Sequence, residues 1–233
     1  MASMTTIITI LIIITTISNI VYASTMQEND ILCLKSIKSS IQDPHNSLTS
    51  WQFPKKITPG FICSFAGIQC WNALENRVLN IDLSSLGLKG EFPSGIFKCE
   101  SLSTLILSNN KFYGSIPSNI STMVPFIVNL SLSSNDFSGE IPASLGNFTY
   151  LNSLELDHNR FSGRIPSTIG SLARLREFSV ANNLLVGPIP HFESGILLPE
   201  QSYWIIPVIS NLNIRKYLNF QLLENVKNSP EQK

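Results

Sequence analysis

A repeated spacing of glycine and proline limits the folds open to this chain more than any other feature. Five glycines stand 24, 25, 24 and 24 positions apart, and five prolines keep the same steps. The glycines are Gly90, Gly114, Gly139, Gly163 and Gly187, and the prolines are Pro93, Pro117, Pro142, Pro166 and Pro190. Units of this length cannot bury an apolar face alone, so the pattern predicts five stacked repeats that share one core.

Apolar residues keep fixed places around an asparagine in four of the units. The asparagines are Asn110, Asn135, Asn159 and Asn183. Apolar residues stand eight, five and three positions before each asparagine and two after it: Leu102, Leu105, Leu107, Phe112, Ile127, Leu130, Leu132, Phe137, Leu151, Leu154, Leu156, Phe161, Leu175, Phe178, Val180 and Leu185. This alternation predicts one short strand per unit with one face inward. In the first unit we expect Val78, Ile81 and Leu83 in the core.

The asparagine has a physical role in such a stack. A chain that turns away from each strand leaves backbone groups inside, and a buried side-chain amide both donates and accepts hydrogen bonds. We therefore expect a ladder of stacked asparagines. The first unit has Leu86 at this place, as a terminal repeat with a different outer neighbour can have.

The pattern L-x-x-L-x-x-L-x-L-x-x-N-x-F-x-G-x-I-P over residues 77–192 resembles the plant-type leucine-rich repeat. Before it, Asp30-Ile31-Leu32-Cys33-Leu34, Asp43-Pro44, Ser50-Trp51 and Phe65-Ala66-Gly67-Ile68-Gln69-Cys70-Trp71 resemble the N-terminal cap of plant repeat receptors. The resemblance implies an α/β solenoid, a leucine-rich-repeat horseshoe with short parallel strands and an N-terminal helical cap.

Three further segments resemble the inactive receptor-like kinases that bind shared co-receptor kinases. They are Phe61-Ile62-Cys63, Glu75-Asn76-Arg77-Val78-Leu79-Asn80 and Phe178-Ser179-Val180-Ala181-Asn182-Asn183. The kinase motifs and the membrane span of that family do not occur in this sequence. The resemblance implies a receptor-like ectodomain that binds other proteins.

Four segments are expected along the chain. Residues 1–23 have the apolar run and small residues of a signal peptide cut after Ala23, although no Lys or Arg precedes the run. An uncleaved N-terminal anchor is the alternative. Apart from such an anchor, no membrane-spanning helix is expected. The product is expected to be secreted or to lie at the extracellular face of the plasma membrane.

Residues 24–76 are expected to form the cap, and residues 77–192 the five repeats. The atypical tail, 193–233, either docks on the last repeat or, as we favour, is the disordered end of a truncated or misspliced receptor.

The cap holds a predicted helix over residues 30–42. Ile31, Leu34, Ile37 and Ile41 share one helical face, and Asp30 is placed to cap its first turn. Cys63 and Cys70 enclose a short loop, and we expect a disulfide between them. For Cys99 we favour a small unpaired core residue; a bridge from Cys33 to Cys99 is the alternative.

Three sequons predict N-glycosylation in a secreted chain: Asn119-Ile120-Ser121, Asn129-Leu130-Ser131 and Asn147-Phe148-Thr149. Asn119 and Asn147 are expected on accessible loops. Asn129 lies beside an inward-facing leucine, so its own side chain points to the concave face. Either that site stays unoccupied or a partner binds elsewhere.

Catalysis, cofactors and metals are not expected. The chain has 16 basic and 16 acidic side chains, so nothing favours nucleic acid, and its four cysteines match no zinc spacing. No nucleophile, metal or nucleotide motif occurs, and the three histidines lie outside such motifs. Glu155, Asp157 and Glu177 can share one face, but we interpret them as a solvated acidic patch rather than an acid–base pair.

The concave face is therefore the predicted partner-binding surface. Its expected contact residues are Asn80, Asp82, Thr104, Ile106, Ser131, Ser153, Glu155, Asp157, Glu177 and Ser179. Small polar side chains on a broad curve suit a protein better than a small molecule. The expected partner is a receptor or co-receptor kinase ectodomain whose signalling the chain modulates. The alternatives are an inhibitor of an extracellular enzyme and a truncated receptor product without function.

Overall fold

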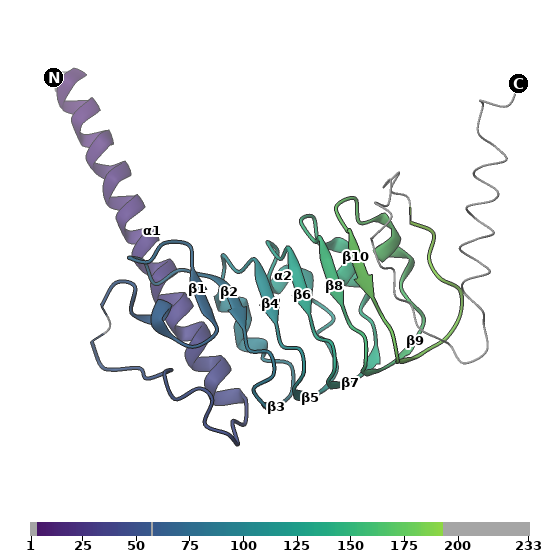
Figure 1. The fold of residues 1–233 in the computed structure, drawn as a ribbon. Helices are drawn as coiled ribbons and strands as arrows, with labels where there is room; N and C mark the ends of the chain where they lie inside the picture. The colour runs from purple at the N-terminus through teal and green to yellow at the C-terminus, as the bar shows by residue number, and fades with distance from the viewer. Residues whose placement is uncertain (1–3, 57, 193–233) are drawn as a thin grey trace, which may run out of the picture.

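The computed structural model describes residues 4–56 and 58–192, and the predicted tail, residues 193–233, lies outside this part. The described chain forms a stacked series of coils that begins against one long helix (Figure 1). Each coil contributes one strand to an inner sheet and one to a second sheet, and in the first four coils a helical turn then leads to the next inner strand. The predicted leucine-rich-repeat solenoid with its N-terminal helical cap is confirmed.

Helix α1, Met4–Ser40, is longer than the sequence predicted. We expected the helix to begin at Asp30, but this residue lies in its interior, and its carboxylate accepts a hydrogen bond from the backbone of Val78 instead. The reason is that no glycine or proline separates the apolar N-terminal run from the cap, so nothing ends the helix between them. The expected buried face is present, since Leu34 and Ile37 are fully enclosed.

The inner sheet has the order β1-β2-β4-β6-β8-β10. Its strands are β1 Ile68–Cys70, β2 Val78–Asp82, β4 Thr104–Ile106, β6 Asn129–Ser131, β8 Ser153–Glu155 and β10 Glu177–Ser179. β1 runs antiparallel to β2 and covers that edge of the sheet, whereas each later strand pairs in parallel with its predecessor. One strand from each repeat, as the alternation predicted, thus builds the concave side.

A second, parallel sheet is formed by the short segments that come after the recurring asparagine of each coil, or after Leu86 in the first coil. The sequence reasoning did not predict this sheet. Its strands are β3 Lys89–Gly90, β5 Lys111–Gly114, β7 Asp136–Glu140, β9 Arg160–Gly163 and β11 Leu184–Leu185. Short helical turns complete the first four coils: η2 Ser94–Lys98, α2 Ile120–Met123, η3 Ala143–Asn147 and η4 Ser167–Ser171. A further turn, η1 Phe61–Ser64, belongs to the cap. The glycine of each Gly-x-Ile/Phe-Pro segment has a positive φ, which explains why this place needs glycine.

The core consists of the predicted inward residues. Every predicted strand leucine is at most 1% exposed, and the phenylalanines after the asparagines stack from coil to coil. The ring of Phe137 lies 6.1 Å from Phe112 and 6.3 Å from Phe161, with interplanar angles of 5° and 8°. Leu185 in the last coil is only half-buried, because no further described coil covers it. Stacking, rather than any single coil, therefore creates the core.

The predicted asparagine ladder is present. Asn135 shows the pattern. Its amide nitrogen donates to the backbone carbonyl of Leu107 in the preceding coil at 2.9 Å, and to the backbone carbonyls of Leu132 and Ser133 in its own coil. Its side-chain oxygen accepts a bond from the backbone amide of Phe112. Asn110, Asn159 and Asn183 repeat these contacts. Each asparagine thus ties two coils together through backbone groups that are partly or fully buried.

Two disulfides fasten the cap. Cys63 is bonded to Cys70, as expected, across 7 residues, and Cys33 is bonded to Cys99 across 66 residues. The favoured interpretation of Cys99 as an unpaired core residue was therefore wrong. Cys33 and Cys99 are both fully buried, so burial alone did not distinguish a thiol from a bridge. The bond joins α1 directly to the end of η2 and locks the cap onto the first coils.

Candidate protein-binding face

The side chains on the concave side of the inner sheet form three rows. Parallel pairing places Asn80, Thr104, Asn129, Ser153 and Glu177 in one row and Asp82, Ile106, Ser131, Glu155 and Ser179 in the next. Two residues further on come Ser84, Ser108, Ser133, Asp157 and Ala181. The structure thus brings all ten predicted contact residues onto one face. Their role in binding stays a prediction.

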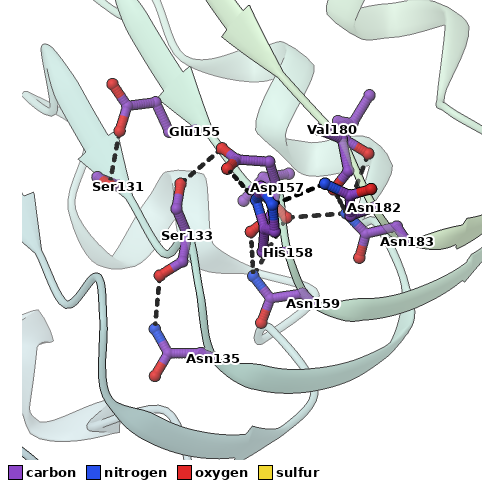
Figure 2. A network of polar contacts seen from close by, with 12 residues as sticks. Ser131, Ser133, Asn135, Glu155, Asp157, His158, Asn159, Val180, Asn182 and Asn183 are labelled. Atoms are coloured by element: carbon purple, nitrogen blue, oxygen red, sulfur yellow. Dashed lines mark hydrogen bonds and ion pairs between the residues drawn. The ribbon is translucent and has the colours of Figure 1, made fainter. Parts of the chain in front are cut away.

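Hydrogen bonds between coils hold the polar side chains of this face in place (Figure 2). Ser131 donates to the Glu155 carboxylate at 2.8 Å, and Ser133 donates to Asp157 at 2.7 Å. The two serines are 7% and 8% exposed, whereas both carboxylates remain partly open to solvent. The face therefore presents ordered acidic groups over a layer of buried hydroxyls.

Asp157, His158 and Asn182 form the best-connected polar group of the face. Asp157 Oδ2 lies 2.8 Å from His158 Nδ1, and the Asn182 amide nitrogen lies 2.7 Å from His158 Nε2 (Figure 2). Because the amide donates to Nε2, the neutral imidazole carries its proton on Nδ1 and donates it to Asp157. His158 has a positive φ of 53°, as Ser134 and Asn182 have at the same place in their coils.

The hydrogen bonds control the charge of Asp157. Burial raises the pKa of its carboxyl, but bonds from His158, Ser133 and Ser179 outweigh burial and hold the pKa below its ordinary value. Asp157 is therefore ionised over the physiological range. The serine hydroxyl donates to the carboxylate and the second imidazole nitrogen is taken by an amide, so this group does not contain the serine–histidine contact that activates a nucleophile.

A strip of aromatic and cationic residues, exposed except for the half-buried Arg77, borders the inner sheet, and the sequence reasoning missed it. The edge strip consists of Trp71, Arg77, Phe126, Tyr150 and Arg174. Phe126, Tyr150 and Arg174 each stand three positions before an inner strand, in successive coils. The first two rings lie 6.1 Å apart, and the Arg174 guanidinium is 5.3 Å from Tyr150.

Ser101 stands three positions before β4, the place that Phe126, Tyr150 and Arg174 take before later inner strands, and it contacts Trp71 and Arg77. The Trp71 indole donates to the Ser101 carbonyl at 3.1 Å, and Arg77 donates to the Ser101 hydroxyl at 2.9 Å. Arg77 also lies 5.3 Å from the Trp71 ring. Trp71, Phe126 and Tyr150 are 54%, 52% and 40% exposed. The signal in the sequence was the residue just before Ile127, Leu151 and Leu175, which is aromatic or cationic each time.

The three sequons lie in different surroundings. Asn119 and Asn147 are exposed at helical turns on the outer side of the coils, as expected. Asn129 is half-buried in β6, and its amide nitrogen donates to the Thr104 hydroxyl at 3.3 Å. A glycan on Asn129 would cover the centre of the first row. Whether any sequon carries a glycan stays a prediction.

The described residues hold neither a metal cluster nor a helix suited to a bilayer. No cluster of three His, Cys, Asp or Glu side chains in residues 4–56 and 58–192 is arranged to hold a metal ion. Within the same ranges, no helix combines the length and the apolar character that crossing a bilayer requires.

Family models match the chain at both of its architectural parts. Residues 27–71 match the leucine rich repeat N-terminal domain, and residues 101–123, 126–148 and 150–172 match the leucine rich repeat. These matches cover the cap and the three central coils that carry most of the concave face.

Similar full-length proteins are plant receptor-like kinases. The inactive LRR receptor-like serine/threonine-protein kinase BIR2 of Arabidopsis thaliana is 45% identical over 102 residues, 44% of this chain and 17% of that protein. A probably inactive leucine-rich repeat receptor-like protein kinase of the same plant is 49% identical over 121 residues, 52% of this chain and 19% of the relative. The chain thus spans under a fifth of the length of these relatives.

Solved structures with the same fold are plant receptor ectodomains. The BIR2 ectodomain from Arabidopsis thaliana has a TM-score of 0.68 and 48% identity, and covers 69% of this chain and 83% of its own. A chain of the BIR3–SERK2 complex has a TM-score of 0.67 and 44% identity, over 69% of this chain and 85% of that one. The complex of the receptor kinase HAESA with the peptide hormone IDA and the co-receptor SERK1 matches at 0.53 and 32% identity, over 67% and 30%. The described solenoid is thus of an extracellular type.

Proposed function

Because this chain belongs to the plant leucine-rich-repeat receptor family, with an ectodomain of the inactive receptor-like kinase type, we propose that it binds a co-receptor kinase ectodomain without catalysing a reaction. The observation that carries the proposal is the likeness to a chain of the BIR3–SERK2 complex, which covers 85% of that chain at 44% identity. By occupying a shared co-receptor, the chain modulates signalling by the receptors that need it.

The edge strip and the adjoining concave rows supply the contact surface. Exposed aromatic rings and arginines are enriched at the centres of protein interfaces, and here they are fixed in place by their neighbours. The ordered carboxylates of Glu155 and Asp157 lie on the same concave face, in the second and third rows from the strip. A partner with an apolar centre and flanking charges of both signs fits this surface.

The polar rows supply orientation more than affinity. The hydroxyls of Ser131 and Ser133 already donate to carboxylates within the chain, so a partner gains few new bonds from them. Trp71, Phe126 and Tyr150 can instead bury large ring areas at low entropic cost. We therefore assign most of the binding free energy to the rings and the choice of partner to the charges.

The test is capture of plant membrane proteins by the secreted, glycosylated chain, with identification by mass spectrometry. The proposal predicts recovery of co-receptor kinases and their loss with the Tyr150→Ser chain. The matched control is Tyr113→Ser, since Tyr113 lies on β5 and is 47% exposed, away from the strip. Specific recovery of a wall-degrading hydrolase instead would contradict the proposal and support an enzyme inhibitor.

A further inference from the structure

A surface cavity on the outer side of the coils is lined by both the exposed ring of Phe97 and the sequon residue Asn119. The cavity measures about 440 Å³ and lies between η2 and α2. It is lined by Ser94, Phe97, Pro117, Asn119, Thr122 and Met123. Phe97 is 51% exposed, although the residue that precedes it, Ile96, is completely buried. An exposed phenylalanine ring thus forms part of a hollow whose rim holds Asn119.

Asn119 is free to carry a sugar. It is exposed and stands before α2, yet its side chain makes no capping hydrogen bond. By contrast, the amide of Asn129 is engaged with Thr104 on the concave face. Ser121, the hydroxyl residue of the Asn119 sequon, is only 8% exposed, so attachment must take place before this coil folds.

We propose that an N-linked glycan at Asn119 folds back into this cavity and that its first N-acetylglucosamine covers the Phe97 ring. In the attachment step, the Asn119 amide nitrogen bonds to the anomeric carbon of the sugar. The bond from that carbon to its lipid pyrophosphate carrier breaks, the pyrophosphate leaves with the electron pair, and the amide loses one proton. No redox partner is needed.

The chemistry of the cavity suits a sugar ring. One face of N-acetylglucosamine presents C–H groups that pack on an aromatic ring, while its acetamido and hydroxyl groups need hydrogen-bond partners. Phe97 and Met123 supply the apolar side, and Ser94 supplies a hydroxyl. The Thr122 hydroxyl already donates to the Asn119 carbonyl at 2.8 Å, so it can only accept a bond from the sugar. The volume lies within the range of small-ligand clefts, about 300–1,000 Å³. The tether at Asn119 keeps the sugar at the cavity, so little further entropy is lost.

The experiment is a double-mutant cycle on the full secreted chain. Thermal unfolding is measured for the unchanged protein, Asn119→Gln, Phe97→Ala and the double variant, and site occupancy is read by glycopeptide mass spectrometry. We expect an occupied site and a fall in Tm of about 2–4 °C on removing the glycan when Phe97 is present, with little change when it is absent. Trimming to a single N-acetylglucosamine should preserve the effect.

Asn147→Gln is the matched control, because Asn147 is also exposed but does not line the cavity. The change in Tm caused by Asn147→Gln should be the same with Phe97 and in the Phe97→Ala background. Nuclear Overhauser contacts between the first sugar and the Phe97 ring protons should appear in the unchanged protein. An unoccupied Asn119, or a glycan whose loss lowers Tm equally with and without Phe97, would overturn the proposal.

Discussion

The carboxylate of Asp30 accepts a hydrogen bond from the backbone amide of Val78 at 2.7 Å, 48 residues further along the chain. This bond joins α1 to the first inner strand, and the Asp30 side chain is only 2% exposed. The pKa of Asp30 is raised to about 7, chiefly by burial of its carboxyl. The negative charge of Glu100 also raises this pKa, whereas the hydrogen bond from Val78 and the positive charge of Arg77 lower it. The junction between cap and repeats therefore contains a carboxyl that keeps its proton in mildly acidic solution.

Substitution of Asp30 by asparagine tests this pH dependence. The pKa in the folded chain, about 7, lies above the ordinary value of 3.8, so between these values the folded state binds more protons than the unfolded state. Stability should therefore fall as pH rises from about 4 to about 7. Relative to Asp30→Asn, the unchanged protein should lose about 1.4 kcal/mol per pH unit inside this window. Urea unfolding at pH 4.5, 5.5, 6.5 and 7.5 measures both curves, and parallel curves would contradict the assignment.

The asparagine ladder makes a stability prediction. Asn135→Ala removes the bonds donated to three backbone carbonyls and the bond accepted from the Phe112 amide. The Leu107 carbonyl keeps its bond from Asn110, whereas the Phe112 amide loses its side-chain partner. The free energy of unfolding should fall by about 3 kcal/mol. Asn152→Ala is the control, because Asn152 is also half-buried but its side chain makes none of the ladder bonds. Equal losses in the two variants would show that the ladder bonds are not the cause.

The disulfides should contribute unequally. A 66-residue loop loses more entropy on closure than a 7-residue loop, so the chain-entropy estimate is about 4 kcal/mol for Cys33–Cys99 and about 2 kcal/mol for Cys63–Cys70. Replacing each pair by alanine, in separate variants, and comparing denaturant midpoints checks the order. A greater loss from the short bridge would contradict the view that the long bridge locks the cap onto the coils.

Periodicity was sufficient to predict the core, the inner strands and the ladder, because the core and strand positions recur in all five coils and the asparagine recurs in four of them. The roles of Asn135 and Phe137 followed from spacing alone, since their neighbours in the stack are copies of themselves. The concave rows followed in the same way, because Ser153 and Glu155 must face opposite to Leu154 in a strand.

Features that depend on one contact between distant parts of the chain were not predicted. The Cys33–Cys99 bond joins elements 66 residues apart, and no local pattern distinguishes it from two buried thiols. Asp30 has the sequence position of a helix cap, but its partner is a distant strand amide. The second sheet was missed because strands such as Lys89–Gly90 are too short to show alternation. The edge strip was missed because its members come from the cap as well as from the repeats.

Titration calorimetry of the secreted chain with a purified SERK2-type co-receptor ectodomain measures the proposed interaction itself. We expect saturable binding at one site, with Tyr150→Ser weakening the affinity at least tenfold, a loss of about 1.4 kcal/mol or more, and Tyr113→Ser leaving it unchanged. Circular dichroism confirms that both variants are folded. Absence of binding by the folded, unchanged chain would show that it is not a co-receptor ligand, and equal affinity of the Tyr150→Ser variant would show that the edge strip is not the contact surface.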